Sequence, residues 1–523
     1  MSNRNIFNSI QLSRPKNNMF DLSHDVKLSL NMADLVPIMC TECVPGDKIN
    51  IAVESLLRFS PLVSPVMHRM DVTFHYFFVP NRILWEGWED FITNTKTAGS
   101  LPAFPTIQVN KTGSNYNSLL DYMGIPDPQQ TPQFEHENVN AIPFAAYQKI
   151  YDEYYRDQNL IESVYQPLVN GDNSSNGDLY LLRTRCWEHD YFTSALPFAQ
   201  KGDPVQLPVT IANSPIKYNL FGTGLSDPQI SETVNWQGQP SGTSTTPSAP
   251  TGTQNPTDTG IEGGQFYADN SNAGSITTIN DLRRAYALQK WLEKAARAGS
   301  RYFESILVNF GLKSPDSRLD RPEYITGSKS PVIISEVLNT TGDTGATDPL
   351  PQGNMSGHAL SITNGNQGSY FCQEHGYVIG IMSVLPKTAY QQGIPRHFLK
   401  IQDPTQYFTP DFANIGEQEI LNKEIMAFQD NGLATFGYTP RYAEYKYESN
   451  RVAGDFRGSL DFWHEGRIFD FGAPPSLNAA FVTADPSTRI FAVTDPTVQK
   501  LYAHVFNKVK MVRPMPKFGT PMI

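Results

Sequence analysis

A run of eight β-branched, aromatic and polar residues, 72–79 (VTFHYFFV), constrains the fold of this chain more than any other stretch. Successive side chains of a strand point to opposite faces. One face would carry Val72, Phe74, Tyr76 and Phe78, and the other Thr73, His75, Phe77 and Val79. A strand filled on both sides is typical of the middle of a packed β-sandwich or barrel. Pro80 should end its pairing, because proline has no N–H to donate.

Further strands are predicted at three places, residues 48–53, 377–385 and 459–462. The segment 377–385 (YVIGIMSVL) is also apolar on both sides, so the core should combine segments about 300 residues apart. One helix is well marked, because Asn280 can cap a helix over 281–298 and Gly299 can end it. A second, aromatic helix is predicted around 145–156. Since Pro and Gly interrupt most of the remaining chain, the sequence favours an all-β framework with long loops.

Charged residues are scarce in this chain. They make up 18% of its 523 residues, against about 25% in an average globular domain. A surface that is poor in charge and rich in Tyr, Phe, Pro and Asn indicates burial against other subunits, or else a soluble protein of low charge. The formal net charge of −11 argues against a protein whose whole surface binds nucleic acid.

The two ends of the chain are more basic than the rest. The first acidic residue is Asp21, and no Asp or Glu follows Asp495. The candidate contacts with a DNA backbone are therefore Arg4, Arg14, Lys16, Lys500, Lys508, Lys510, Arg513 and Lys517. These contacts would bind phosphates, and nearby aromatic rings would stack on bases.

The search for catalytic, metal and cofactor motifs gives none that stands. Cys40 and Cys43 have the spacing of half a zinc site, but Cys186 and Cys372 do not supply a second close pair. His464 begins a zincin-like HE pair, yet position 468 is Ile, so the second histidine is missing. Four thiols in a chain of this size do not make a disulfide scaffold, which favours a reducing compartment. We therefore expect no metal, no cofactor and no enzymatic activity.

Targeting signals are also missing from the pattern. No apolar run follows the first positive charge, so a secretory signal is not evident. No window of about 18 uncharged apolar residues occurs, so a membrane span is not expected. The sequence predicts a protein that is soluble and intracellular when made.

One long segment, residues 208–279, differs in texture from its surroundings. Its centre, residues 237–274, is dominated by Gly, Ser, Thr, Pro, Asn and Gln, with almost no aliphatic side chains. Such a composition cannot bury a core of its own. We therefore expect an exposed, mobile insertion at about 208–279.

A series of motifs lies in a fixed order outside this insertion. They are DLSH at 21–24, HYFFVPNR at 75–82, EYYRD at 153–157, LRTRCW at 182–187, DYFTSALP at 190–197, RAGSRY at 297–302, DRPEY at 320–324, EHG at 374–376 and FGYTPRYAEYK at 436–446. In this order they resemble the major capsid protein of microviruses, the small icosahedral phages with single-stranded DNA. The gokushovirus branch is the most similar.

The resemblance implies a fold, an assembly and a set of partners. The fold would be all-β, a single eight-stranded antiparallel jelly roll with long inserted loops and a few helices, forming one capsid domain over 1–523. Sixty copies would build a T=1 icosahedral shell around a circular single-stranded DNA genome, with a small basic DNA-binding protein and a scaffolding protein as further partners. The protein would be part of the virion, assembled in the host cytoplasm. The insertion at 208–279 would be a protrusion at the threefold axes and a candidate contact for a host-surface receptor.

The alternative interpretation is a β-rich glycan-binding or glycan-cleaving protein, or a phage spike protein. Scattered carboxylates near tryptophans such as Trp187 and Trp463 could line a sugar-cleaving cleft. A glycan-directed protein would usually carry a secretion signal and form a monomer or small oligomer, whereas a spike would form trimers or fibres. The absent signal and the low charge disfavour the glycan interpretation.

Overall fold

The structure, a computed structural model, describes residues 16–93, 101–110, 115–127, 136–203, 205, 216–219, 225–226, 266–268, 279–299, 301–340 and 353–518. The chain divides into two compact units, one formed by Met1–Ala199 with Ala295–Ile523 and the other by Gln200–Lys294. Within the predicted insertion, the described elements are β8 (Ile216–Asn219), β9 (Leu225–Ser226), β10 (Phe266–Ala268) and the first residue of α4. The remainder of that prediction lies outside the described residues.

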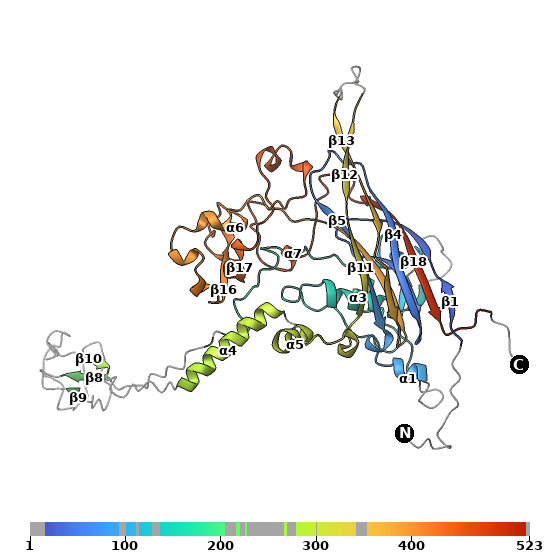
Figure 1. Ribbon diagram of the computed structural model, residues 1–523, viewed down its shortest axis with the longest axis horizontal. Helices are drawn as coiled ribbons and strands as arrows, with labels where there is room; N and C mark the ends of the chain where they lie inside the picture. The colour runs from blue at the N-terminus through green and yellow to red at the C-terminus, as the bar shows by residue number, and fades with distance from the viewer. Residues whose placement is uncertain are drawn as a thin grey trace, which may run out of the picture. The chain divides into compact units, whose positions relative to one another are not determined.

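Two antiparallel sheets form the framework of the larger unit (Figure 1). Sheet 1 has the spatial order β1 (Asn18–Asp21), β18 (Leu501–Arg513), β4 (Lys48–Phe59), β13 (Met355–Asn364) and β12 (Ile333–Leu338), and in addition β2 (His24–Leu30) pairs with β18 and β14 (Gly368–Phe371) pairs with β4. Sheet 2 has the order β11 (Glu323–Pro331), β5 (Met70–Pro80), β15 (Gly376–Pro386) and β3 (Val36–Cys43). The unit is thus strand-rich, with a few helices, as the sequence predicted.

The strand predicted at residues 72–79 is confirmed as part of β5, in the interior of sheet 2 between β11 and β15. Its side chains from Val72 to Phe78 on one face belong to a buried cluster that also contains side chains of β4 and β18. The two sheets therefore share one core, as in a β-sandwich. On its other face, Phe77 and Val79 belong to a second cluster that includes α3 (Ile142–Ile150).

Most other predicted elements are confirmed, with shifted ends. The strands expected at 48–53 and 377–385 are parts of β4 and β15. The helix expected at 281–298 is α4 (Ile279–Ala298), which begins one residue before its predicted cap, and Gly299 follows it with a φ of +102°. The aromatic helix is α3, continued by a π-helical turn over Tyr151–Tyr155.

The strand predicted at 459–462 is wrong. A 3₁₀ turn, Asp461–Trp463, covers the end of this segment. Its backbone bonds are local: the N–H of Leu460 donates to the carbonyl of Asp455 at 3.0 Å, and the N–H of Trp463 donates to the carbonyl of Leu460 at 3.1 Å. Because these backbone N–H groups already bond to nearby carbonyls, they are not available to pair with a neighbouring strand, and the apolar residues of this segment do not form one.

Shorter elements decorate the framework. The helices are α1 (Trp88–Thr93), α2 (Leu119–Tyr122), α5 (Tyr302–Phe310), α6 (Asn422–Ile425) and α7 (Ala479–Val482). There are also two small two-stranded antiparallel sheets. One pairs β6 (Thr106–Asn110) with β7 (His136–Asn140), and the other pairs β16 (Glu417–Leu421) with β17 (Thr435–Pro440). Across the described ranges, every helix is too short or too polar to cross a membrane.

Candidate nucleic-acid interface

Strand β18 alternates between buried and solvent-facing side chains. Its odd-numbered residues, such as Val505, Val509 and Met511, are buried in the core between the sheets. The opposite face carries Tyr502, His504, Phe506, Lys508 and Lys510. Because the side-chain period of a strand is two, the apolar odd positions fix the aromatic and basic even positions on the solvent side.

Neighbouring strands add cations to the same surface. Directly opposite residues of an antiparallel pair lie on one face. Lys27 of β2 and Lys48 and Arg58 of β4 lie opposite outward-facing residues of β18. We call this surface the outer β18 face, and its members are Lys27, Lys48, Arg58, Tyr502, His504, Phe506, Lys508 and Lys510.

Carboxylates neutralise part of this charge. Glu54 forms an ion pair with Lys508, and Asp25 Oδ1 lies 2.9 Å from Nε2 of His504. Asp21 of β1 is paired with Lys510 in the β-ladder. The five Lys and Arg side chains of the face therefore outnumber its three carboxylates, and the face is net positive.

Several cations of the outer β18 face remain available to bind an anion. Hydrogen bonds from the hydroxyl and backbone N–H of Ser23 lower the pKa of Asp21, and the charge of Lys510 lowers it further. Among the described cations of this face, Lys27, Lys48, Arg58 and Lys510 make no ion pair. Basic side chains interleaved with aromatic rings are the combination by which proteins hold single-stranded nucleic acid.

The eight predicted DNA contacts divide into four pairs. Arg4 and Arg14 lie outside the described residues. Lys508 and Lys510 lie on the outer β18 face, while Lys16 and Lys517 are exposed on the segments that lead into β1 and out of β18.

The two ends of the described chain lie side by side (Figure 1). Asn18 is opposite Arg513 in the pairing of β1 with β18, and its Nδ2 donates to the carbonyl of Met515 at 2.7 Å. Lys16 and Lys517, which flank these paired segments, therefore approach the same edge of sheet 1.

Two of the predicted contacts, Lys500 and Arg513, are engaged within the chain. Lys500 is only 3% exposed, and its Nζ donates to the carbonyl of Asp495 at 2.5 Å. The guanidinium of Arg513 points back toward the core side, where its Nε lies 3.2 Å from the buried Asp47. Both cations are occupied within the chain. Arg513 is an odd-numbered residue on the core-facing side of β18, whereas Lys500 lies immediately before the strand and is held by its bond to Asp495. The number of charges along the sequence does not reveal these contacts.

The same register identifies the residues that the sequence argument missed. Tyr502, Phe506 and the cations of β2 and β4 belong to the outer β18 face although they lie apart in the sequence. The signal was present in residues 501–513 (LYAHVFNKVKMVR), where apolar and polar side chains alternate over much of the segment. A strand prediction there would have separated Lys508 and Lys510 from Arg513.

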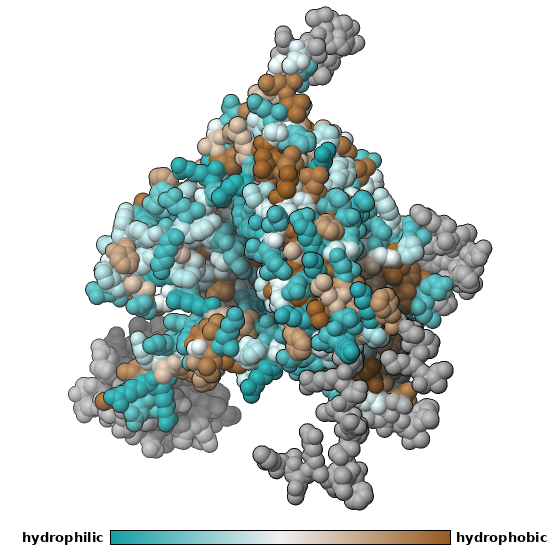
Figure 2. Space-filling view, turned by 45° about the vertical axis from the view of Figure 1, so that its right-hand side comes forward, coloured by the Kyte–Doolittle hydropathy of each residue, from teal (hydrophilic) through white to brown (hydrophobic). Residues whose placement is uncertain are grey.

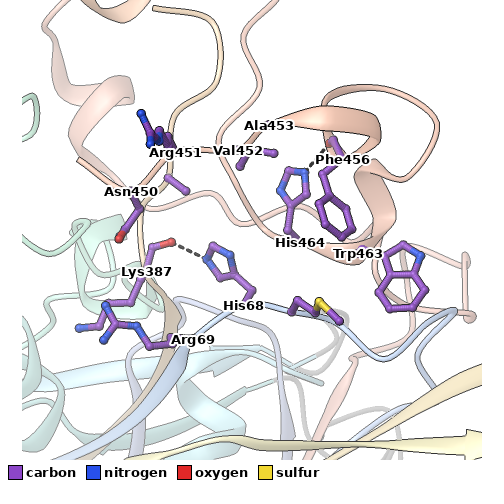
Figure 3. A pocket seen from close by; sticks show the side chains of 12 residues that line it. His68, Arg69, Lys387, Asn450, Arg451, Val452, Ala453, Phe456, Trp463 and His464 are labelled. Atoms are coloured by element: carbon purple, nitrogen blue, oxygen red, sulfur yellow. Dashed lines mark hydrogen bonds between the residues drawn. The ribbon is translucent and has the colours of Figure 1, made fainter. Parts of the chain in front are cut away.

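A second basic site is a pocket of about 270 Å³ at the end of sheet 2 where β5 begins and β15 ends (Figure 3). On one side it is lined by Arg69 and Arg451, and on the other by the rings of Phe456 and Trp463. His68 Nε2 lies 2.5 Å from the carbonyl oxygen of Lys387, as a donor, and burial lowers the pKa of this imidazole to about 4. The pocket therefore offers permanent guanidinium charges, with His68 neutral.

The cysteines and the histidine considered as metal ligands have other surroundings in the structure. Cys40 and Cys43 both lie on strand β3, and all four cysteines are free thiols. Both ring nitrogens of His464 are used, because Nε2 donates to the carbonyl of Phe456 at 2.7 Å and Nδ1 accepts from the N–H of Gly466 at 2.9 Å. Over the residues that the structure covers, no group of three or more potential ligands could hold a metal ion.

Many large apolar side chains are exposed on the single chain. In the larger unit they include Met67, Phe310, Leu312, Ile333, Val337, Ile362, Phe398, Ile401, Phe408, Phe428 and Leu433. Brown apolar patches interrupt the teal surface in Figure 2, among them one at the base of the β12–β13 hairpin at the top. Apolar patches of this kind mark surfaces that are covered by other protein.

Comparisons with known proteins point in one direction. A family model described as "Capsid protein (F protein)" matches residues 8–523. The chain is 34% identical to the capsid protein VP1 of Chlamydia phage 1, over 99% of this chain and 97% of the relative. It is 36% identical to capsid protein VP1 of Bdellovibrio phage phiMH2K, over 98% and 96%. It is 31% identical to capsid protein VP1 of Spiroplasma virus 4, over 96% and 94%.

Proposed function

Since this chain belongs to the capsid protein (F protein) family and is a structural major capsid protein of gokushovirus type, we propose that it works by self-association into a closed shell. Its chemistry is contact between copies. Each copy uses different patches on its two sides, and such heterologous contacts close into rings when symmetry allows. Closing the shell makes every contact simultaneous with many others, so weak pairwise contacts suffice.

The observation that carries this proposal is the set of exposed apolar side chains. Residues such as Ile401 and Phe428 are more than four-fifths exposed in the isolated chain. Each buried Phe or Ile side chain contributes about 1.5–3 kcal/mol when removed from water. Contact with neighbouring copies would cover this surface and also account for the low charge content of the chain.

The framework suits a jelly roll. Taken in chain order, the eight strands β2, β3, β4, β5, β11, β13, β15 and β18 are distributed over the two sheets in the jelly-roll manner, with the fourth and fifth in the same sheet. The first, eighth, third and sixth adjoin in sheet 1, and the second, seventh, fourth and fifth adjoin in sheet 2. These pairings, all antiparallel, support a single jelly-roll domain over 1–523 with long insertions.

The shell is a T=1 icosahedron of sixty copies around circular single-stranded DNA, as the family implies. The insertion at 208–279 forms the protrusion at the threefold axes and contacts the host-surface receptor. The protein is assembled in the host cytoplasm, with a scaffolding protein and a small basic DNA-binding protein as partners. Family membership supports this account.

The genome contact is made by the outer β18 face, together with Lys16 and Lys517. Lysines and Arg58 bind backbone phosphates, and bases stack on Tyr502 and Phe506. The pocket with Arg69 and Arg451 is a second candidate for the same contact. The small excess of cations supports a partner protein that neutralises most of the genome.

The test is to band particles from producing cells on a density gradient. We expect this chain as the dominant protein of uniform small particles that contain nuclease-protected single-stranded DNA. A chain that stays at the top of the gradient, without DNA, would contradict the proposal and favour the glycan-binding alternative.

A further inference from the structure

One phenylalanine side chain is almost fully exposed on a loop whose backbone is held by hydrogen bonds. Phe428 lies between α6 and β17 and is 93% exposed, whereas the preceding Met426 and Ala427 are buried. The backbone of Phe428 has a φ of +63°, in the left-handed region that residues with a Cβ rarely adopt. Strain of this kind persists where surrounding structure imposes it, and it collects at functional positions.

Backbone hydrogen bonds impose the conformation. The N–H of Ala427 donates to the carbonyl of Gln392 at 2.9 Å. Two further bonds close the loop: the N–H of Lys423 donates to the carbonyl of Gly432 at 3.0 Å, and the N–H of Asn422 donates to the carbonyl of Ala434 at 2.9 Å. The backbone that carries the ring is thus fixed before any partner arrives, which lowers the entropic cost of binding.

The approach of Gly393 fixes the base of the loop. A Cβ at this position would overlap the backbone carbonyl of Glu424 in α6. The N–H of Ile394, the next residue, donates to the carbonyl of Lys423 at 3.0 Å. Residues 392–394 therefore hold the loop in position through backbone contacts with α6 and with Ala427.

We propose that Phe428 is an anchor that inserts into a second copy of this chain when subunits assemble. The inference rests on the proposed function and names one residue that carries it. Leu433, 71% exposed, is the other large apolar side chain of this loop that is exposed. The loop's charged residue is Asp430, which repels phosphates, and a phenyl ring and an aliphatic side chain offer no hydrogen bonds to a sugar. Another copy of the chain is the partner that this apolar tip fits.

The direct test is hydroxyl-radical footprinting of the full chain, in intact particles and in subunits dissociated from them. We expect oxidation of Phe428 to fall about tenfold or more in particles, both DNA-filled and empty. Equal oxidation in particles and subunits overturns the inference and leaves the proposed function intact. Protection confined to DNA-filled particles also overturns it, because DNA would then be the cover.

Two variants add a second readout. Phe428→Asn removes the ring and suits the left-handed backbone, since Asn tolerates this conformation. We expect unassembled F428N to melt at or above the wild-type temperature, while its particle yield falls about tenfold or more. Phe428→Leu keeps an apolar side chain and should retain most of the yield.

Normal particle yield from F428N overturns the inference. If F428N does not fold, the footprint of the wild-type particle still decides. If the wild-type chain forms no particles at all, the proposed function fails and the inference fails with it.

Discussion

The phenol of Tyr76 donates a hydrogen bond of 2.8 Å to Oδ1 of Asn507, joining the two sheets through the centre of the core. Tyr76 lies on β5 of sheet 2 and Asn507 on β18 of sheet 1, and both side chains are buried. The Nδ2 of Asn507 also donates to the carbonyl of Ile38 in β3 at 2.9 Å. This polar link fixes how the sheets face each other, since an alternative packing would leave buried polar groups unpaired.

Tyr76→Phe should therefore cost more than the removal of one hydroxyl suggests. The variant leaves Oδ1 of Asn507 buried without its donor, and we expect a loss of about 1–3 kcal/mol in the free energy of unfolding. Denaturant unfolding of the unassembled subunit measures it. Tyr502→Phe, on the exposed face of β18, is the matched control and should change stability by less than about 0.5 kcal/mol.

Gly380 of β15 makes room for the Tyr76 ring. The two residues are directly opposite in the pairing of β15 with β5, and a Cβ on Gly380 would lie 2.6 Å from Cε1 of Tyr76. Gly380→Ala should displace the ring and destabilise the subunit by about 1–3 kcal/mol. Combining it with Tyr76→Phe should cost less than the sum of the two changes, because both act on one contact. Full additivity would contradict this coupling.

Glu465 should make stability depend on pH. Burial raises its pKa from 4.5 to about 7, against the lowering effect of Arg489 and Ser487. Between these values the folded chain holds a proton that the unfolded chain has lost, so this group's contribution to stability falls as pH rises from about 4.5 to about 7. The full effect is on the order of 3 kcal/mol.

Glu465→Gln isolates this effect. Burial lowers the pKa values of His68 and His75 to about 4, and their contributions rise with pH over about 4 to 6.5, in the opposite direction. The difference between wild type and E465Q removes that background. We expect the variant to gain on the wild type across this pH range in melting experiments. Parallel pH profiles would refute a buried, protonated Glu465.

The outer β18 face should contribute to DNA retention in a salt-dependent way. Replacing Lys508 and Lys510 with Gln removes two phosphate contacts, and the slope of log affinity against log salt should shrink by about 1.4 for a single strand. Oligonucleotide binding by the full chain at several salt concentrations measures it. Lys500→Gln is the control: the slope should stay unchanged, and the melting temperature should fall because a buried ammonium bond is lost. An unchanged slope in the double variant removes the face from the proposal.

The framework was predictable from the sequence where the local pattern was complete. Residues 72–79 and 377–385 carry apolar side chains on both faces, and this property by itself places a strand inside a sheet. Their pairing, with Ile379 opposite Phe77, joins segments that the sequence does not mark as partners. Register depends on long-range contacts and could not be read locally.

The candidate site was predictable in part. The basic C-terminal end was found from charge. The Arg513–Asp47 pair depends on which face of β18 meets the core, and the burial of Lys500 depends on how the segment before β18 packs. The left-handed backbone of Phe428 was beyond local reasoning, because phenylalanine has no preference for that conformation. The exposure of its side chain depends on the folded course of the loop, which backbone hydrogen bonds determine.

The mass of the intact particle tests the central claim most directly. Charge-detection mass spectrometry of purified particles should give a protein shell of about 3.5 MDa, the mass of sixty copies of a 58.5 kDa chain, with a fixed additional mass of DNA in the filled population. A chain that remains at 58.5 kDa, or forms trimers of about 175 kDa, would contradict the closed shell.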